Sequence, residues 1–463
     1  MENAEKFLKE NLPVKALERL KKILLTVNPN DEWKVHELIG AAFHDICDAE
    51  GAVQASFNAA KTDTILRDQR RHFSNYLFTL HYLKNIDAEI LFNAAKIYNT
   101  LYRDNFFLSP EPSALSPKIH IAYISPHFLD SSSARFYESL LTDYDREKFF
   151  VTAWSMSADE DEFTKKIRRN VDGYFNVSEI SFEETAQKIN ESGADILFDL
   201  GGHTEGGATL QILGYKPARI QMSGIGYFDT TGLDAVDFYV TDNFLVEGNE
   251  KYFTEQILPL ESIFAFKPNK KMIRAKNNLV RIKHENFTFG CLNNFMKITD
   301  EYLICVKKIL NAVPNSKIIF RDTTPLKSRQ NALAEKIKLA EIPINRVEIL
   351  RGNDNYLDDY AKIDLILDTF PYTGGMMTAL SIYMGVPVLN LRGNFHSQRL
   401  GADMLRLAGL ENFIVNDVDS YVKFAVNYAE NPFEISPDSK LFDTENFVEN
   451  FYNALEEVIK CLS

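Results

Sequence analysis

From Lys118 onward, short runs of β-branched and aromatic residues alternate with stretches whose apolar positions recur every three or four residues. A first series of such runs predicts strands at 119–124, 149–154, 196–200, 220–222 and 238–241. A second series follows the basic, asparagine-rich stretch 267–278 and predicts strands at 288–291, 317–320, 347–350, 365–367 and 387–391. Strands that alternate with helices form parallel sheets covered on both faces, so two series predict two doubly wound α/β units.

The first 110 residues or so predict helices throughout, with apolar positions such as Leu17 and Leu20 at helical spacing. Phe43, Ala52 and Ala59 fall close to the small and large pattern of a tetratricopeptide unit, and a helical bundle with chance spacing is the alternative. Repeat helices bury their faces only against neighbours, so we expect this arm to dock on the next domain. The predicted domains are 1–112, 113–275 and 276–463, the last with a C-terminal helix.

Composition and charge exclude several classes of protein. The formal charge of −14, from 51 Lys and Arg against 65 Asp and Glu, argues against a protein that coats nucleic acid or an anionic membrane. Four scattered cysteines suggest neither a zinc cluster nor a disulfide framework and fit a reducing cytoplasm. The start of the chain has no basic leader, and no apolar run is long enough to cross a bilayer. A cytoplasmic protein without a membrane span is therefore predicted.

The segment from Leu365 to Met384 predicts a strand, a small-residue turn at Thr373, Gly374 and Gly375, and a helix. Such a turn presents unpaired backbone N–H groups and the positive end of a helix dipole, which together bind phosphate. A nucleotide or nucleotide-sugar site is the resulting hypothesis. An ordinary βα turn, with glycine for tight packing, is the alternative.

Further motifs occur in a fixed order along the chain. They are GGHTEGG (201–207), KPARIQ (216–221), GYFDTTG (226–232), DFYVTD (237–242), CLNNFMK (291–297), LDTFPY (367–372), MGVPV (384–388) and RLGADML (399–405), with a helical lead-in SNYLFTLHY (74–82). Together these segments resemble the O-GlcNAc transferase and SPINDLY-like family of glycosyltransferases, family 41, in its bacterial type. The resemblance covers roughly residues 70 to 455.

This resemblance implies the GT-B architecture, in which 113–275 is an acceptor-side Rossmann-like domain and 276–463 binds the nucleotide sugar. It also implies an inverting transfer of a sugar, GlcNAc by default, to Ser or Thr of a protein or peptide acceptor. The implied donor is a UDP-linked sugar used as substrate, with neither a metal nor another cofactor. Without a metal, the charge of the leaving diphosphate must be stabilised by N–H groups, a helix dipole and a fixed cation.

The resemblance assigns donor-binding roles to eight residues of the second domain: Asn293, Asn294, Lys297, Tyr372, Thr373, Gly374, Gly375 and Arg399. Lys297 matches the family's phosphate-contacting lysine and is a catalytic candidate. Arg399 either neutralises the diphosphate or caps neighbouring carbonyls. In the first domain, His127 and His203 are catalytic candidates, and for His203 a structural histidine is the alternative.

Three departures from the family pattern bear on function. Ser131 stands where the family has a histidine near the reacting centre, and His127 occupies the usual aspartate position. We call the turn at Thr373, Gly374 and Gly375 the cradle. Directly after it, Met376 and Met377 stand where the family has His or Thr. Leu380 replaces the carboxylate that holds the ribose and cannot accept its hydroxyl hydrogen bonds. Two functions stay open: an active glycosyltransferase with an altered donor pocket, and a catalytically weak or inactive paralogue that binds polypeptide as the partner subunit of another glycosyltransferase.

Overall fold

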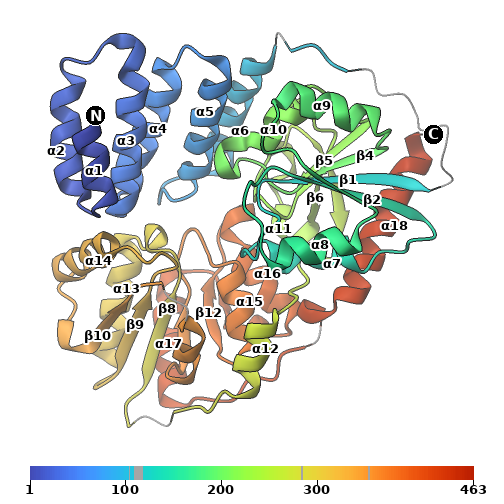
Figure 1. The fold of residues 1–463 in the computed structure, drawn as a ribbon. Coiled ribbons are helices and arrows are strands. Elements are labelled where there is room, and N and C mark those ends of the chain that lie inside the picture. Colours follow the sequence, from blue (N-terminus) through green and yellow to red (C-terminus); the bar gives the residue numbers. More distant parts are fainter. Residues whose placement is uncertain (104, 109–117, 283–284, 353–354, 439, 463) are drawn as a thin grey trace. The chain divides into compact units, whose positions relative to one another are not determined.

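The structure, a computed structural model, describes residues 1–103, 105–108, 118–282, 285–352, 355–438 and 440–462 (Figure 1). Its contacts divide the chain into two compact units. Unit 1 comprises residues 1–63, 79–86 and 268–441, and unit 2 comprises residues 64–78, 87–267 and 442–463. Helix α5 (Leu66–Leu80) contributes to both units. Within the described ranges, no helix is long and apolar enough to cross a bilayer.

Unit 2 is built on a seven-stranded sheet in the order β3-β2-β1-β4-β5-β6-β7, with parallel pairing. The strands are β1 (Ile119–Ser125), β2 (Phe149–Ser155), β3 (Gly173–Asn176), β4 (Ile196–Asp199), β5 (Ile220–Gly224), β6 (Phe238–Asp242) and β7 (Gln256–Leu260). Its helices are part of α5 with α6 (Ala88–Asn99), α7 (Ala134–Thr142), α8 (Glu162–Asn170), α9 (Phe182–Glu191), α10 (Ala208–Leu213), α11 (Asn243–Val246) and α18 (Thr444–Leu462). The central strands are buried along nearly their whole length because helices cover both faces of the sheet.

Unit 1 is built on a six-stranded parallel sheet in the order β10-β9-β8-β11-β12-β13. The strands are β8 (Thr288–Leu292), β9 (Lys317–Arg321), β10 (Val347–Leu350), β11 (Leu365–Leu367), β12 (Val388–Leu391) and β13 (Ile414–Val415). Its helices are α1 (Glu2–Lys9), α2 (Pro13–Leu24), α3 (Glu32–Asp45), α4 (Ala49–Thr62), α12 (Lys270–Asn277), α13 (Asp300–Ala312), α14 (Lys327–Leu339), α15 (Met376–Tyr383), α16 (Leu400–Leu407) and α17 (Val418–Glu430). The prediction of two doubly wound α/β units is therefore confirmed.

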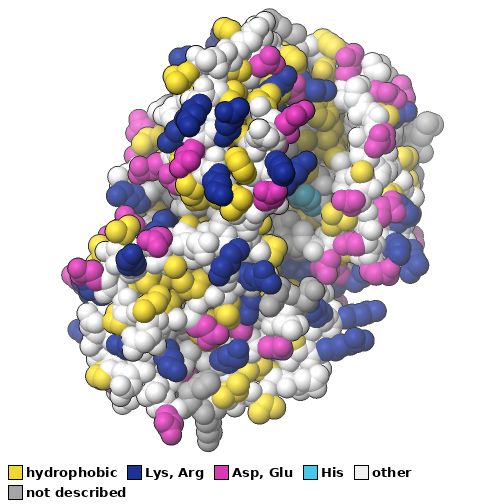
Figure 2. Space-filling model, turned by 60° about the vertical axis from the view of Figure 1, so that its left-hand side comes forward, with side chains coloured by type: hydrophobic (Ala, Val, Ile, Leu, Met, Phe, Trp, Pro, Cys, Tyr) yellow, Lys and Arg dark blue, Asp and Glu magenta, His cyan; other side chains and the backbone are white. Residues whose placement is uncertain are grey.

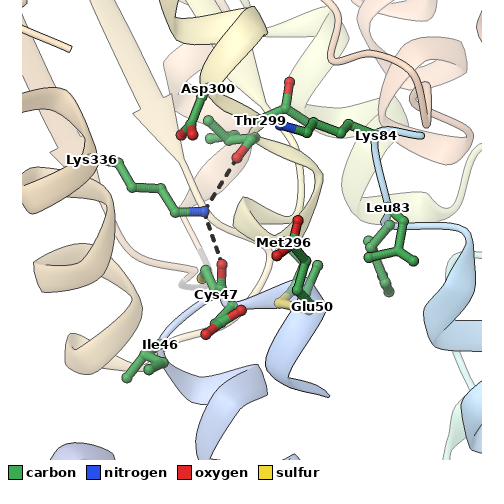
Figure 3. Close-up of a pocket in the computed structure, with 13 residues that line it drawn as sticks. Ile46, Cys47, Glu50, Leu83, Lys84, Met296, Thr299, Asp300 and Lys336 are labelled. Atoms are coloured by element: carbon green, nitrogen blue, oxygen red, sulfur yellow. Dashed lines mark hydrogen bonds between the residues drawn. The ribbon is translucent and has the colours of Figure 1, made fainter. Parts of the chain in front are cut away.

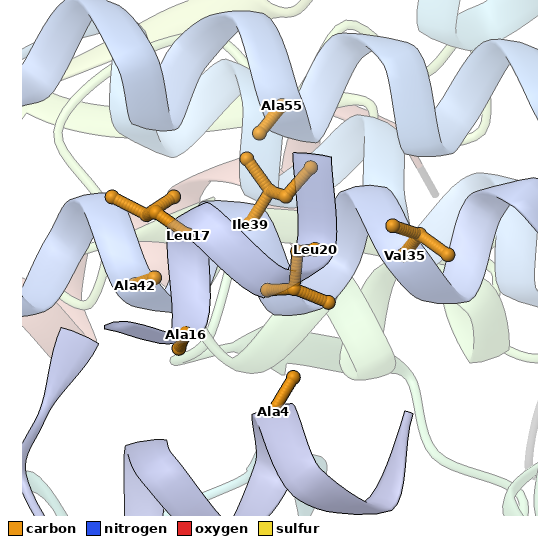
Figure 4. Packing of buried hydrophobic residues seen from close by; sticks show 8 residues of the cluster. All are labelled: Ala4, Ala16, Leu17, Leu20, Val35, Ile39, Ala42 and Ala55. Atoms are coloured by element: carbon orange, nitrogen blue, oxygen red, sulfur yellow. The ribbon is translucent and has the colours of Figure 1, made fainter. Parts of the chain in front are cut away.

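The first four helices form their own small core within unit 1. Figure 4 shows Leu17 and Leu20 of α2 beside Ile39 of α3, and the cluster also contains Ala4, Ala16, Val35, Ala42 and Ala55. A Cβ at Gly51 of α4 would lie 2.5 Å from the Phe43 ring, so α3 and α4 approach closely only with glycine there. The helices predicted for this region are confirmed, and their assignment to tetratricopeptide units stays a prediction.

The predicted three-domain division stays a prediction, and its boundary between 112 and 113 lies outside the described residues. By contacts, α1 to α4 group with the second sheet, and α6 groups with the first. Helix α18 groups with the first sheet, where the Tyr123 hydroxyl donates to the Tyr452 hydroxyl at 3.1 Å. On the face shown in Figure 2, acidic and basic side chains are interspersed, so the net negative charge is not gathered into one patch there.

Candidate functional site

Lys297 lies at the end of the short helical turn Phe295–Lys297, which follows β8. Its Nζ donates to the Thr373 carbonyl at 2.7 Å and lies 3.7 Å from the centroid of the Tyr372 ring. Burial lowers the pKa of Lys297 to about 8, and the charge of Asp368 partly opposes this shift. The ammonium is therefore mostly protonated at pH 7, and it is held beside the glycine turn that precedes α15.

Asp368 organises the glycine turn from behind. Its buried carboxylate accepts from the N–H of Thr369 at 2.9 Å, the N–H of Gly374 at 2.9 Å and the Asn390 amide at 2.9 Å. Burial raises the pKa of Asp368, and these donors and the Lys297 charge oppose the rise. The Gly374 N–H is thus committed to Asp368 and is not available to a ligand.

The part of the cradle with space for a ligand begins at Gly375, one residue after Gly374. A Cβ at Gly375 would meet nothing within 4 Å. Among the residues that the structure describes, no acceptor is found for the N–H groups of Gly375, Met376 and Met377 at the start of α15. These three donors and the Lys297 ammonium make a region suited to a phosphate group.

The two predicted asparagines are used differently. Asn293 donates to the Thr369 hydroxyl at 2.9 Å and so braces the turn that leads to Gly374. The side-chain oxygen Oδ1 of Asn294 accepts from the Met296 N–H at 2.9 Å and from the Arg329 guanidinium, so the side chain points toward α14. The structure therefore brings Asn293 to the cradle and holds Asn294 away from it, while a direct donor contact of either one stays a prediction.

Arg399 follows the loop after β12 and is nearly buried. Its guanidinium donates to the Gly393 carbonyl at 3.3 Å and to the Asn394 carbonyl at 2.8 Å. Of the two predicted roles, capping of neighbouring carbonyls is therefore the one that the structure displays, and diphosphate neutralisation stays a prediction. The Thr373 hydroxyl accepts from the Gly401 N–H at 3.2 Å, which ties the same region to the cradle.

Leu380 is fully buried within α15. Its side chain belongs to the core of unit 1 and supplies no hydrogen-bond acceptor, as predicted from the sequence. That the family holds the ribose with a carboxylate at this position, and that its loss affects donor binding, stays a prediction.

Sequence reasoning missed two buried histidines of unit 1. His81 Nδ1 is hydrogen-bonded to the Ser397 hydroxyl at 2.9 Å, and the His81 ring lies 6.0 Å from the Tyr372 ring. Burial lowers the pKa of His81 and of His396 to about 3 each, and the Lys297 charge adds to the shift of His81. Both rings are neutral at pH 7, and the His81 ring lies beside the Tyr372 ring that Lys297 also contacts. The only signal in the sequence was the presence of His81 in the lead-in motif 74–82.

In unit 2, His203 is a saturated buried side chain. Its Nδ1 is hydrogen-bonded to the Ser74 hydroxyl at 2.9 Å and its Nε2 to the Thr231 carbonyl at 3.0 Å. Tyr98 and Tyr227 pack edge-on against the ring, with centroids 4.8 Å and 5.1 Å away. Because a carbonyl only accepts, Nε2 carries the proton and Nδ1 accepts from Ser74. A catalytic role for His203 stays a prediction, and these contacts favour the structural alternative.

His127 is more accessible and lies just after β1. Its Nε2 is 3.1 Å from the Glu205 carboxylate, and the two side chains are 37% and 62% exposed. This hydrogen bond lowers the pKa of Glu205. The pair lines a cavity of about 380 Å³ beside the ends of β1 and β2. Ser131 instead accepts from the Ala134 N–H at the start of α7, so it has a local capping role.

The structure brings the predicted residues into two groups, one in each unit. In unit 1, Lys297, Tyr372, Thr373, Gly374 and Gly375 meet around Asp368. In unit 2, His127 pairs with Glu205. Among the described residues, no group of three or more His, Cys, Asp or Glu side chains is arranged to hold a metal ion, and the metal independence of the reaction stays a prediction.

Two parallel α/β units with a cradle at the strand ends define the class as a GT-B glycosyltransferase fold. The solved structure of a Thermobaculum terrenum O-GlcNAc transferase mutant has this fold with a TM-score of 0.78 and 21% identity, over 98% of this chain and 92% of that one. Residues 72–286 match the family described as Glycosyl transferase family 41. The chain is thus related to the O-GlcNAc transferase and SPINDLY-like glycosyltransferases, and the resemblance predicted from the sequence is confirmed.

Plant proteins are among the curated relatives. One is named "Probable UDP-N-acetylglucosamine--peptide N-acetylglucosaminyltransferase SPINDLY" from Hordeum vulgare, 28% identical over 378 residues, 79% of this chain and 40% of the relative. The protein of the same name from Arabidopsis thaliana is 30% identical over 322 residues, 68% of this chain and 35% of the relative. The chain therefore spans about two fifths of the length of these curated relatives.

Proposed function

We propose that this chain is an inverting, metal-independent protein O-glycosyltransferase. The proposed donor is a nucleotide sugar, UDP-linked with GlcNAc as the family default, and the proposed acceptor is a Ser or Thr hydroxyl of a protein or peptide. The names of the curated relatives support the class of donor and acceptor for this proposal.

The observation that carries the proposal is the position of Lys297. Its ammonium lies against the Thr373 carbonyl and the Tyr372 ring, and the open N–H groups begin two residues after Thr373, at Gly375. A nucleoside diphosphate brings negative charge that these groups are suited to neutralise without a metal. Because Lys297 is already desolvated, little water must leave when the diphosphate arrives.

In the proposed step, the acceptor hydroxyl oxygen bonds to the anomeric carbon on the face opposite the diphosphate. The bond between that carbon and the diphosphate oxygen breaks, and its electron pair leaves with the nucleoside diphosphate. Charge thus develops on the leaving diphosphate, where Lys297 and the α15 N–H groups stabilise it. The hydroxyl proton passes to a base or to water, and His127, oriented by Glu205, is the candidate base.

A second function is favoured by one specific observation. Leu380 is fully buried at the position where the resemblance implies a ribose-holding carboxylate, and a leucine there predicts weak donor binding. A chain with weak donor binding could still bind polypeptide and act as the partner subunit of another glycosyltransferase. This alternative predicts that the purified chain transfers little or no sugar even at high donor concentration.

A product assay tests the proposal. The purified chain is incubated with UDP-GlcNAc, other UDP-linked sugars and GDP-linked sugars together with Ser- and Thr-containing peptides, and the products are identified by mass spectrometry. We expect transfer from one donor, undiminished in excess EDTA and lowered at least 100-fold by Lys297→Ala and by His127→Ala, about the range measured for oxyanion and general-base groups. Absence of product from every donor contradicts the proposal, and loss of product in EDTA contradicts metal independence.

A further inference from the structure

Two cations lie on one face of α14, two helical turns apart, at Arg329 and Lys336. Each one reaches two other elements of unit 1. One element is the junction between α3 and α4, residues 44–48, and the other is the donor-lysine turn, which we define as residues 293–298. Both elements are remote from α14 in sequence, so the contacts are long-range.

Arg329 has no exposed surface and is the largest fully buried side chain described in the chain. Its Nε donates to the Asp322 carboxylate at 2.6 Å, and its Nη1 donates to the His44 carbonyl at 2.9 Å. Its Nη2 donates to the Asn294 side-chain oxygen. A planar guanidinium satisfies all these acceptors from one position, which a lysine at this site would not do.

Asp322 completes this network. Its Oδ1 also accepts from the N–H of Phe295 at 3.3 Å, one residue after Asn294. The backbone and the side chain of the donor-lysine turn are therefore both fixed to the Arg329 and Asp322 pair. The charge of the pair is compensated internally, as burial requires.

Lys336 makes a second link of the same kind. Its Nζ donates to the Cys47 carbonyl at 2.9 Å and to the Ile298 carbonyl at 3.4 Å. Figure 3 shows the lysine reaching Cys47 across a pocket of about 350 Å³ that Met296 and Thr299 also line. Residues on both sides of Lys297, namely Asn294 and Ile298, are thus held by two cations of one helix.

We propose that Arg329 and Lys336 form a clamp that sets the position of Lys297 and couples it to the α3–α4 junction. The inference rests on the proposed function, because it assigns the clamp to the donor site. In this account neither cation touches the donor; both are positioning residues. The helical arm then has a role beyond presenting a surface, since its α3–α4 junction supplies two of the carbonyls that the clamp requires.

An ion pair with only a structural role would stabilise the fold equally with and without bound nucleotide. A positioning clamp makes a different prediction, since loosening it specifically removes the benefit of Lys297. The distinction is measurable as the coupling between α14 and Lys297 in a double-mutant cycle. Lys336→Met is the gentler variant because Lys336 is only half-buried, and Arg329→Met combined with Asp322→Asn avoids leaving an unpaired buried carboxylate.

The first readout is calorimetric titration with UDP and GDP. We expect Lys297→Ala to weaken nucleotide binding at least tenfold in the wild-type background and less than threefold in the Lys336→Met background. The matched control is Arg346→Gln, an arginine of unit 1 that caps the Ser316 and Val313 carbonyls away from the turn. In that background the tenfold loss should persist. An equal loss in all three backgrounds overturns the clamp.

The second readout needs no nucleotide. Hydrogen exchange of peptides covering 42–48 and 293–299 should accelerate together in Lys336→Met and in the Arg329→Met, Asp322→Asn variant, and should be unchanged in Arg346→Gln. Unchanged exchange in one of the two segments overturns the coupling. Wild-type protein that binds neither nucleotide would contradict the proposed function. If hydrogen exchange nevertheless accelerates in both segments of the variants, the coupling of the two elements stands without a role at a donor site, so the two failures are distinguished.

Discussion

Units 1 and 2 both place polar side chains where parallel strands end, but they use them in opposite ways. In unit 1, the Lys297 ammonium has three donor protons and makes one hydrogen bond among the described residues, to Thr373. In unit 2, both ring nitrogens of His203 are hydrogen-bonded and two tyrosines pack against the ring. A side chain with spare bonding capacity is available to a ligand, whereas a saturated one supports the fold.

Two buried carboxylates show the opposite distribution: the one with satisfied hydrogen bonds is in unit 1, and the one with an unsatisfied oxygen is in unit 2. Asp368 of unit 1 accepts from several donors and holds the cradle together. Asp229 of unit 2 accepts from the Thr230 N–H, while its Oδ2 has no hydrogen-bond partner in the described part of the chain. Unit 1 therefore combines a carboxylate with satisfied hydrogen bonds, Asp368, and a cation with spare donors, Lys297. Unit 2 combines a histidine with satisfied hydrogen bonds, His203, and an acid with an unpaired oxygen, Asp229.

The largest expected effect comes from removing the support in unit 1. Asp368→Ala leaves the N–H groups of Thr369 and Gly374 and the Asn390 amide without their acceptor inside the protein. We expect the free energy of unfolding to fall by about 3–5 kcal/mol and nucleotide binding to be lost. Chemical denaturation checks the first result and calorimetry the second. Unchanged stability would mean that Asp368 does not organise the turn.

The next effect concerns the saturated histidine. His203→Ala removes the partners of Ser74 and Thr231 and opens a cavity between two tyrosines, so we expect a loss of about 2–4 kcal/mol in the free energy of unfolding. His127→Ala is the matched control, since its exposed pair with Glu205 contributes less than about 1 kcal/mol. If the two variants were equally stable, the structural account of His203 would be wrong.

Lys297→Met should increase stability while removing function. The folded-state pKa of about 8 lies below the ordinary lysine pKa of 10.5, so below pH 8 the folded protein carries the cost of a desolvated charge. That cost is relieved as pH rises from about 8 to 10.5, because the folded state releases its proton first. We expect Lys297→Met to stabilise the chain by about 1–3 kcal/mol at pH 7, with the gain shrinking by pH 10. Chemical denaturation of the variant and of wild type at pH 7 and pH 10 measures this gain. If Lys297→Met were less stable than wild type at pH 7, the cost assigned to the buried charge would be wrong.

The smallest effect is predicted for the unsatisfied acid. Burial raises the pKa of Asp229 to about 8, and the charge of Glu255 adds to the rise. The folded state therefore holds a proton that the unfolded state loses above pH 4, so stability falls as pH rises from about 4 to 8. Asp229→Asn should remove this dependence. Its amide N–H₂ would be buried without an acceptor at the Oδ2 position, which offsets most of the gain, so we expect the chain to be stabilised by about 1–2 kcal/mol at pH 8. A stability profile parallel to that of wild type over this range would contradict the assignment.

Most strands were predictable, and those that were missed share a physical cause. All ten predicted strands occur, while β3, β7 and β13 were missed. Each missed strand lies at an edge of its sheet. A central strand is buried on both faces and reads as a continuous apolar run, whereas β3 exposes Phe175 and Asn176, and β7 contains Pro259, which only an edge tolerates.

The candidate site was predictable only in part, for a different reason. The glycine turn could be found because it lies in a local motif of strand, turn and helix, and Lys297 could be found because it lies in a motif that resembles the family. Arg329 could not, since its partners His44 and Asn294 lie 285 and 35 residues away. Such a network is set by tertiary packing and leaves no local pattern. His81 was hidden in the same way, because its partner Ser397 is 316 residues distant.

The central claim is that unit 1 holds a working nucleotide site built on Lys297, and calorimetric titration with UDP and GDP at pH 7 tests it most directly. The account predicts that one nucleotide binds and that Lys297→Ala weakens binding at least tenfold, about 1.4 kcal/mol. It also predicts that wild-type affinity falls toward that of the variant as pH rises above about 8, where Lys297 loses its charge. Absence of binding by either nucleotide at millimolar concentration, or equal binding by wild type and Lys297→Ala, would contradict it.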